Sequence, residues 1–406
     1  MSISLIYHAF GIKAKYEYTK TEYKNGAVYF TIERPLYECK CAHCGSRKVR
    51  SRGCKIRTFR NVPIGLKTSY IILRFRRLEC LECGKILQEE IPFADGQKSY
   101  TRAFQRYVLE LSKEMSIKAL ADYLGTSWDL IKKIQKDHLR KKYASLKSKD
   151  IRFIAIDEIA SHKGHKYLTV VMDLESGAVI YVGEGRKSES LDKLWKKLGR
   201  YKKNIQAVAM DMWPAYIDAV TSNLPQAKIV FDHFHIAKMF NDKLSELRRG
   251  LHRELKDVMQ KEVLKGTRWL LLKNHSNLNE EKNEKQKLEE ALNINKPLAA
   301  AYYLKEELRL LWEEKTVDEA KKFLGKWCGK AYASGVAMLQ KMAKTLLMHR
   351  TGIFNYFHHR ISTGPLEGTN NKIKVLKRKM YGFRDFEFFK LKIFDLHNHD
   401  FVLKGT

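Results

Sequence analysis

The sequence lacks any apolar run long enough to span a membrane, and it has no internal repeat. Its first ten residues are mildly apolar, but they lack the basic leader and the cleavage site of a secretory signal. No basic amphipathic anchor for a membrane surface stands out. We therefore expect a soluble, cytoplasmic protein without a membrane partner. A disulfide framework is also disfavoured, because seven cysteines with two close pairs suit metal binding in a reducing compartment.

Acidic residues are scarce relative to basic ones. The 406 residues include 46 Asp and Glu against 77 Lys and Arg, which gives a formal net charge of +31. The basic residues are spread along the chain rather than gathered in a tail. Such a positive field favours a polyanionic partner, of which nucleic acid is the commonest. The length allows two to four domains.

Two C-x-x-C pairs, each followed by a glycine, lie in a segment that is typical of β-strands. Strands are expected at residues 3–7, 27–32 and 70–75. Two such pairs form knuckles that close one tetrahedral thiolate site, so the sequence predicts a zinc ribbon with one structural Zn²⁺. Cys39 is an alternative ligand, but Cys41 has the two-residue gap to its partner; Cys54 and Cys328 fit no ligand pattern. The predicted ligands are Cys41, Cys44, Cys80 and Cys83.

A helix over about 102–115 is followed by a helix-turn-helix pattern. Apolar residues at helical spacing in 117–124 are followed by Gly125 as the turn and by Ser127 as the cap of a second helix. An ordinary helical hairpin is the alternative, but the preceding ribbon and the basicity favour DNA binding, with the second helix reading the major groove. The expected contacts are Ser127, Trp128, Lys132 and Lys133, with Asp129 also exposed.

Three short apolar runs each stop at an aspartate. Residues 153–156 precede Asp157, residues 207–210 precede Asp211, and residues 229–231 precede Asp232. Short runs without polar alternation favour strands that are buried on both faces. A hairpin over 166–182 and a helix over 188–198 separate the first two runs. Right-handed crossovers then place the Asp211 strand beside the Asp157 strand and parallel to it, with both carboxylates at strand ends.

About 130 residues after Asp232 have helical periodicity, and Ser362-Thr363-Gly364-Pro365 then breaks the pattern before a further helix. Leu366, Ile373, Leu376 and Met380 fall on one side of that helix, which predicts packing on a sheet. The other side presents a carboxylate among amides and bases: Glu367, Asn370, Asn371, Lys374 and Arg378. We expect the last four to contact DNA.

These motifs together resemble a known family over nearly the whole chain: bacterial insertion-sequence transposases of the ISL3 family, which have an RNase H-like DDE catalytic domain. The resemblance implies that Asp157, Asp211 and Glu367 are the catalytic carboxylates and that the helical stretch is an insertion into the catalytic domain. It also implies binding to the element's terminal inverted repeats and to target DNA, as a homodimer or higher oligomer, near the bacterial nucleoid. The motifs are Arg76-Arg77-Leu78-Glu79-Cys80-Leu81-Glu82-Cys83, Ile156-Asp157-Glu158, Met210-Asp211-Met212-Trp213-Pro214-Ala215-Tyr216, Phe231-Asp232-His233-Phe234-His235 and Gly364-Pro365-Leu366-Glu367-Gly368-Thr369-Asn370-Asn371-Lys372-Ile373-Lys374.

The residue types agree with that chemistry. Two Mg²⁺ or Mn²⁺ ions about 3.5–4 Å apart need several anionic oxygens at one place, with Asp157 bridging both ions and Asp211 and Glu367 on one each. Asp232 is the rival of Asp211, but its strand is expected two spacings, about 10 Å, from Asp157. We therefore interpret Asp232 and His235 as structural or DNA-proximal. Strand alternation turns Glu158 to the opposite face.

The predicted architecture is a multidomain α+β protein with a zinc ribbon, a helix-turn-helix and an RNase H-like core with a mixed five-stranded sheet and a large helical insertion. A non-catalytic DNA-binding regulator and a structure-specific nuclease of the same fold are the alternative functions. The expected domains are residues 1–95 for the N-terminal strands and ribbon, 96–148 for the helix-turn-helix, 149–234 for the first part of the core, 235–361 for the insertion and 362–406 for the rest of the core.

Overall fold

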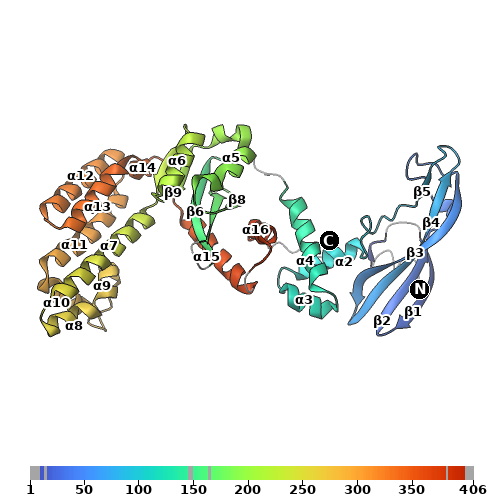
Figure 1. Ribbon diagram of the computed structural model, residues 1–406, viewed down its shortest axis with the longest axis horizontal. Helices are drawn as coiled ribbons and strands as arrows, with labels where there is room; N and C mark the ends of the chain where they lie inside the picture. The colour runs from blue at the N-terminus through green and yellow to red at the C-terminus, as the bar shows by residue number, and fades with distance from the viewer. Residues whose placement is uncertain (1–9, 13–15, 145–149, 163–165, 381–382, 398–406) are drawn as a thin grey trace. The chain divides into compact units, whose positions relative to one another are not determined.

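A computed structural model describes residues 10–12, 16–144, 150–162, 166–380 and 383–397 of the chain (Figure 1). The chain forms two compact units, one made of residues 1–144 with 379–406 and the other of residues 145–378. Each unit contains one five-stranded sheet. The strand expected at residues 3–7 lies outside the described residues.

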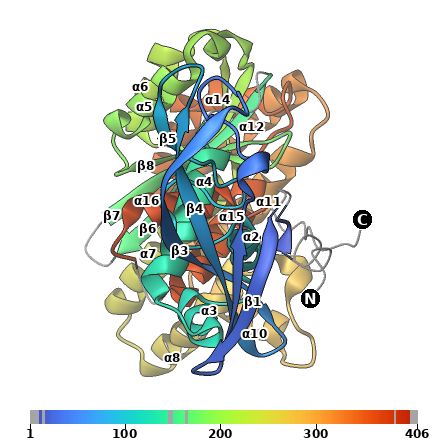
Figure 2. The ribbon, with the colours of Figure 1, turned by 90° about the vertical axis from the view of Figure 1, so that its right-hand side faces the viewer.

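The sheet of the first unit is built on a long antiparallel hairpin, β3 with β4, which Figure 2 shows. β2 pairs parallel with β4, β1 pairs with the far side of β2, and β5 pairs with β4. Buried positions alternate along β2 and β4, and their aromatic and branched side chains form the core. The expected strands at 27–32 and 70–75 are confirmed. The strands are β1 (Glu17–Lys24), β2 (Ala27–Glu33), β3 (Val49–Ile64), β4 (Lys67–Cys80) and β5 (Ile86–Gln88).

The helix-turn-helix follows this sheet. α2 (Arg102–Leu111) precedes α3 (Ile117–Leu124) and α4 (Trp128–Lys142). The Ser127 hydroxyl caps α4 by accepting the Leu130 N–H, and Gly125 ends α3 at a φ of +58°. The predicted inner face is confirmed, because these side chains meet in one buried cluster: Leu120, Ala121, Leu124, Ile131 and Ile134.

The C-terminal helix α16 (Phe386–Phe394) packs on α4 within the first unit. Phe388 and Leu391 of α16 are buried with Leu139 of α4. We expected residues 362–406 to belong to the catalytic core, whereas the compact grouping places Lys379 onward with the helix-turn-helix. The apolar contact between these side chains is the physical reason for the grouping, since it joins α16 to α4 across more than 240 residues of sequence.

The sheet of the second unit has the strand order β10-β9-β6-β7-β8. β9 lies beside β6 and parallel to it, β10 is parallel beyond β9, and β7 with β8 forms an antiparallel hairpin, as predicted. One expectation was wrong: β6 continues past Asp157, because its second half pairs with β7. Asp157 therefore lies within a strand, whereas Asp211 and Asp232 each directly follow a strand end. The strands are β6 (Phe153–His162), β7 (Lys166–Asp173), β8 (Val179–Glu184), β9 (Ala207–Met210) and β10 (Lys228–Phe231).

Helices cover both faces of this sheet (Figure 1). α5 (Asp192–Leu198) and α6 (Pro214–Asn223) lie on one face, where the Tyr216 hydroxyl of α6 contacts Thr169 of β7 at 2.9 Å. α15 (Gly364–Lys379) lies on the other face, where Asn370 contacts Asp157. Leu366 and Ile373 of α15 are buried, which confirms that its apolar side packs inward.

The insertion between β10 and α15 consists of helices, as predicted, and these helices form one bundle (Figure 1). Leucines, alanines and Trp327 fill its core, and a capping box of Thr316 and Glu319 begins the helix α12. Within the described residues, no helix is both long and apolar enough to cross a membrane. Its helices are α7 (His233–Glu254), α8 (Val258–Gly266), α9 (Arg268–Leu272), α10 (Glu284–Ile294), α11 (Lys296–Arg309), α12 (Val317–Ala333), α13 (Ala337–Met348) and α14 (Arg350–Asn355).

Candidate metal centre, active site and DNA-binding surfaces

Four cysteines converge at one end of the β3–β4 hairpin. The ligand atoms of Cys41, Cys44, Cys80 and Cys83 all lie within 4.8 Å of one another. Sγ of Cys41 is 3.7 Å from Sγ of Cys83, and Sγ of Cys44 is 3.5 Å from Sγ of Cys80. A tetrahedral site with Zn–S bonds of about 2.3 Å places its sulfurs about 3.8 Å apart. The donor set therefore fits one Zn²⁺ ion.

Equivalent turns hold the two cysteine pairs. The glycine that follows each pair donates its N–H to the carbonyl of the first cysteine at 3.0 Å and takes a positive φ. Backbone N–H groups, led by that of Cys44, lower the pKa of the Cys41 thiol to about 6, and the Cys83 N–H lowers the pKa of Cys80. Because the thiolate is the metal-binding form, each turn presents one readily ionised sulfur.

The remaining described cysteines lie outside this cluster. The rival ligand Cys39 is fully buried, its thiol donates to the Pro35 carbonyl at 3.5 Å, and burial raises its pKa. Burial likewise raises the pKa of Cys328 in the helical core to about 11, while Cys54 is exposed. Only the four-cysteine set has the geometry of a metal site among the described cysteines.

Three aspartates lie at neighbouring positions of the second sheet, with Asp157 within β6, Asp211 directly after β9 and Asp232 directly after β10. Ala155 pairs with Ala209, and Met210 pairs with Phe231. Continuing both registers by one or two residues places Asp157 beside Asp211 and Asp211 beside Asp232. Neighbouring strands lie about 4.8 Å apart, so Asp157 and Asp211 are one spacing apart, while Asp232 is two spacings from Asp157.

The Asp157 and Asp211 carboxylates form a half-buried pair of like charges. Burial raises the pKa of Asp157, and the nearby charge of Asp211 raises it further. Burial also raises the pKa of Asp211. The charge of His235, on the first turn of α7, opposes both shifts. A cation shared by two partly desolvated carboxylates, one strand spacing apart, stabilises their charged forms. The pair therefore fits a divalent metal site with oxygen ligands.

α15 contacts Asp157 through the side chain of Asn370. Nδ2 of Asn370 donates to Oδ2 of Asp157 at 2.7 Å, and the Glu158 N–H donates to Oδ1 of Asp157 at 2.8 Å. We expected Asn370 on the exposed side of α15, but it is buried. The reason is its position four residues after Leu366, which puts both side chains on the inner face. That spacing was the signal that sequence reasoning overlooked.

Glu367 lies one helical turn before Asn370, at the exposed start of α15. Residues three apart on a helix are neighbours, so Glu367 is on the side of α15 that adjoins Asp157. Among the described residues, only the four cysteines place three or more ligand atoms within 4.8 Å of one another. The carboxylates of Asp157, Asp211 and Glu367 are therefore more widely spaced than the cysteine thiols. Asn371, Lys374 and Arg378 are exposed on the same helix.

Asp232 has a different environment from its two neighbours. It is buried, with 3% of its surface exposed. Its Oδ1 accepts the Phe234 N–H at 2.9 Å and thereby caps α7. Its Oδ2 accepts the Thr363 N–H at 2.9 Å and also the Thr363 hydroxyl. The Asp232 carboxylate is thus occupied by protein donors, which supports the structural interpretation.

Glu158 faces the opposite side of the sheet from Asp157, as strand alternation predicts. It pairs with Thr169, whose hydroxyl contacts α6. Burial raises the pKa of Glu158, and the charges of Asp211 and Asp157 add to that shift. Its nearest cation is Arg186, 3.9 Å away, whose guanidinium also stacks on Trp213 at 4.8 Å from the ring centre.

The basic residues of α4 divide into a paired face and an exposed face. Lys132 was expected to be exposed, but it is half-buried and lies 3.1 Å from Asp385 of the α16 cap. Lys136 pairs with Asp385 at 2.8 Å, and Arg140 pairs with Glu387 at 2.6 Å. Hydrogen bonds from Arg140 and Lys136 lower the pKa of Glu387 to about 2.

The exposed face of α4 is formed by other residues. Ser127 and Trp128 at its start are exposed, with 52% of Trp128 accessible, and Lys133 and Lys141 are exposed further along. The N-terminal residues of a recognition helix are those that reach base edges. This face, and not the one under α16, therefore has the exposure that DNA contact requires.

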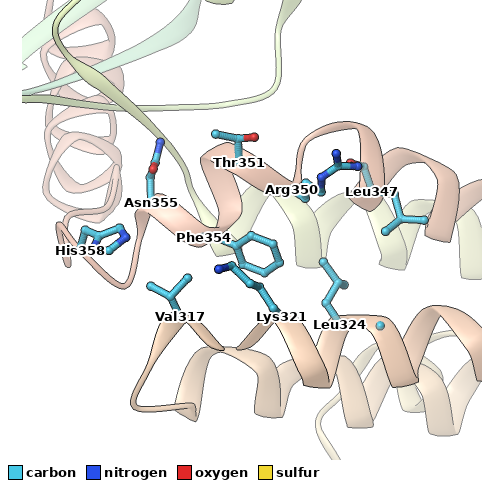
Figure 3. Close-up of a pocket in the computed structure, with 10 residues that line it drawn as sticks. Val317, Lys321, Leu324, Leu347, Arg350, Thr351, Phe354, Asn355 and His358 are labelled. Carbon is cyan, nitrogen blue, oxygen red and sulfur yellow. The ribbon is translucent and has the colours of Figure 1, made fainter. Parts of the chain in front are cut away.

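A basic groove lies within the helical insertion. It has a volume of about 510 Å³ and is lined from α12, α13, α14 and the turn that follows. Figure 3 shows Phe354 and Arg350 facing Lys321 and Leu324 across it, with His358 at one end. Its ten lining residues include no acid. This combination of cations and an aromatic ring suits an anionic ligand.

Three family models match the chain. Residues 154–393 match the ISL3 model described as a transposase, and residues 89–139 match the helix-turn-helix domain of transposase family ISL3. Residues 37–83 match the zinc-finger of transposase IS204/IS1001/IS1096/IS1165. The first segment spans nearly the whole second sheet, the helical insertion, α15 and most of α16, the second contains α2, α3 and most of α4, and the third contains the four-cysteine cluster.

Curated relatives are similar over most of their length. The chain is 33% identical over 356 residues to the transposase for insertion sequence element IS1001 of Bordetella parapertussis, covering 87% of each protein. It is 27% identical over 400 residues to the transposase for insertion sequence element IS1557 of Mycobacterium tuberculosis, covering 91% of this chain and 88% of that one. The Drosophila P element transposase strand transfer complex is a distant structural match, with a TM-score of 0.39 and 10% identity over 75% of this chain and 94% of that one.

Proposed function

Because the chain belongs to the ISL3 family of insertion-sequence transposases, we propose that it cuts and rejoins DNA through Asp157, Asp211 and Glu367 with two Mg²⁺ or Mn²⁺ ions. Family membership makes it a DNA-cutting and DNA-transferring enzyme with a zinc ribbon and a DNA-binding helix-turn-helix.

One observation carries the proposed active site. Asp157 lies in β6, Asp211 directly follows the parallel neighbouring strand β9, and α15 is anchored to Asp157 by Asn370, one turn after Glu367. When bound, the two ions activate the attacking water or 3′-hydroxyl and stabilise the leaving oxygen. Asp157, Asp211 and Glu367 would hold the ions, and Asn370 would orient the Asp157 carboxylate by its hydrogen bond.

The exposed face of α4 is the proposed surface for DNA recognition. Ser127, Trp128 and Lys133 would contact the terminal inverted repeat, with the start of α4 nearest the bases. We reassign Lys132 to the α16 contact, because its ammonium group is already paired with Asp385. Asn371, Lys374 and Arg378 on α15 would contact the phosphates of the cut strand. Cutting the two ends of one element favours a homodimer or a higher oligomer on DNA.

Cleavage of a labelled repeat end tests the assignment. Asp157→Asn, Asp211→Asn and Glu367→Gln keep side-chain shape but remove the metal-binding charge, so we expect each to abolish Mg²⁺-dependent cleavage. Gel-shift affinity for the repeat should stay within about twofold of wild type. Full cleavage by Glu367→Gln would remove Glu367 from the site. Joining of a 3′-hydroxyl end to target DNA separates this function from that of a nuclease.

A further inference from the structure

A single buried carboxylate joins the two ends of the helical insertion. Asp232 begins the insertion as the cap of α7, and its Oδ2 binds both the N–H and the hydroxyl of Thr363, which lies 131 residues later. Asp232 is 3% exposed and Thr363 is 2% exposed. Water is therefore kept from these hydrogen bonds, which strengthens them relative to exposed ones.

Thr363 is the residue on which the first turn of α15 is built. Its carbonyl accepts the Glu367 N–H at 2.9 Å, the first hydrogen bond of that helix. A shift of Thr363 therefore moves the backbone of Glu367 directly. Asn370 fixes the next turn against Asp157, so the first turn depends on Asp232 for its own position.

We infer that Asp232 is a positioning residue for Glu367, acting through Thr363. It sets the distance of the Glu367 carboxylate from Asp157 and Asp211 and so sets the affinity of the site for its divalent ions. This inference rests on the proposed role of Glu367 as a metal ligand. Residues that orient a ligand in this way change metal affinity by about 10- to 100-fold when they are replaced.

Substitutions separate the two hydrogen-bonding functions of Asp232. In Asp232→Asn, one end of the amide is an NH₂ group, which faces a donor N–H whichever way the amide turns, toward Phe234 or toward Thr363. Thr363→Val keeps the shape and the backbone N–H but loses the hydroxyl bond. Thr363→Ser keeps both bonds and serves as the conservative rescue.

Asp173 provides a matched control in the same unit. It is also 3% exposed, and its Oδ2 also accepts a backbone N–H and a hydroxyl from one residue, Ser176. It is the last residue of β7, opposite Ile154 in the register and three residues from the position opposite Asp157. Asp173→Asn should cost folding stability of a similar size without displacing α15.

The test measures metal binding, backbone order and cleavage on the zinc-loaded, full-length protein. We expect the Mn²⁺ dissociation constant, read by electron paramagnetic resonance without DNA, to rise about 10- to 100-fold in Asp232→Asn and less in Thr363→Val. It should stay near wild type in Thr363→Ser and Asp173→Asn. Amide exchange in the first turn of α15 should speed up in Asp232→Asn and, to a smaller extent, in Thr363→Val, but not in Thr363→Ser or Asp173→Asn. Cleavage by Asp232→Asn should need more Mn²⁺ but recover at saturation.

Two results would overturn the inference. One is wild-type Mn²⁺ affinity and wild-type α15 exchange in folded Asp232→Asn. The other is an equal loss of Mn²⁺ affinity in Asp173→Asn, which would mean general destabilisation. Wild-type cleavage by Glu367→Gln would instead refute the proposed function of Glu367, so the failure of one is distinguishable from the failure of the other.

Discussion

Lys132 and Lys133 are adjacent in sequence, and the structure predicts opposite outcomes for their removal. Lys133 is exposed on the face of α4 proposed to meet DNA. The Lys132 ammonium lies 3.1 Å from Asp385 and 5.8 Å from the centre of the Phe388 ring. Lys133→Ala should therefore remove a phosphate contact, whereas Lys132→Ala should loosen α16.

The size of the Lys133 effect follows from counterion release. One lost phosphate contact lowers the slope of log affinity against log salt by about 0.9. When salt rises fourfold, from about 50 to 200 mM, the ratio of the wild-type affinity to the Lys133→Ala affinity should fall by a factor of about 3.5. Fluorescence anisotropy with a labelled repeat at four salt concentrations measures this slope.

Lys132→Ala should leave the slope unchanged. Asp385 keeps Lys136 at 2.8 Å, so the loss is that of one partly exposed ion pair, up to about 1 kcal/mol of folding stability. A small fall in melting temperature checks it. A lowered slope in Lys132→Ala with an unchanged slope in Lys133→Ala would refute the assignment of faces, because α16 would then not cover Lys132 in the DNA complex.

Two further predictions concern the zinc ribbon and the groove in the insertion. Cys80→Ser should lose the zinc and weaken repeat binding while the second unit keeps its melting transition, and stoichiometric zinc in that variant, measured by elemental analysis, would exclude this ligand set. Lys321→Ala with Arg350→Ala should lower the salt slope for DNA by about 1.8 if both contact phosphates, whereas an unchanged slope would assign the groove to another anion.

The arrangement of the second sheet was predictable because each cue is local. Short apolar runs mark buried strands, and the fixed handedness of crossovers then places the Asp211 strand beside the Asp157 strand. The four-cysteine cluster was predictable for a similar reason, since a C-x-x-C spacing already encodes its turn. The true end of β6 was missed because the pairing of its second half with β7 depends on a neighbour and not on apolar spacing.

Partners distant in sequence were not predictable from periodicity. A helical pattern shows which side of α16 is apolar. It does not show that Phe388 packs on α4, or that Asp385 forms an ion pair with Lys132. In the same way, nothing local indicates that the amide of Asn370 ends 2.7 Å from Asp157, 213 residues away. Such contacts depend on the folded arrangement and decide which predicted residues are exposed to DNA.

The three aspartates show that burial and the number of protein donors, more than residue type or position, separate a metal ligand from a structural residue. Asp232 is 3% exposed and accepts three hydrogen bonds, from the Phe234 N–H and from the N–H and hydroxyl of Thr363, so a cation at that carboxylate would displace existing bonds. Asp157 accepts two hydrogen bonds and Asp211 accepts one, both residues are half-buried, and repulsion by the Asp211 charge helps to raise the pKa of Asp157. Removing this repulsion requires a cation or a proton. An aspartate is therefore a candidate metal ligand within β6 and directly after β9, whereas the aspartate directly after β10 holds the helix that supplies the proposed third carboxylate.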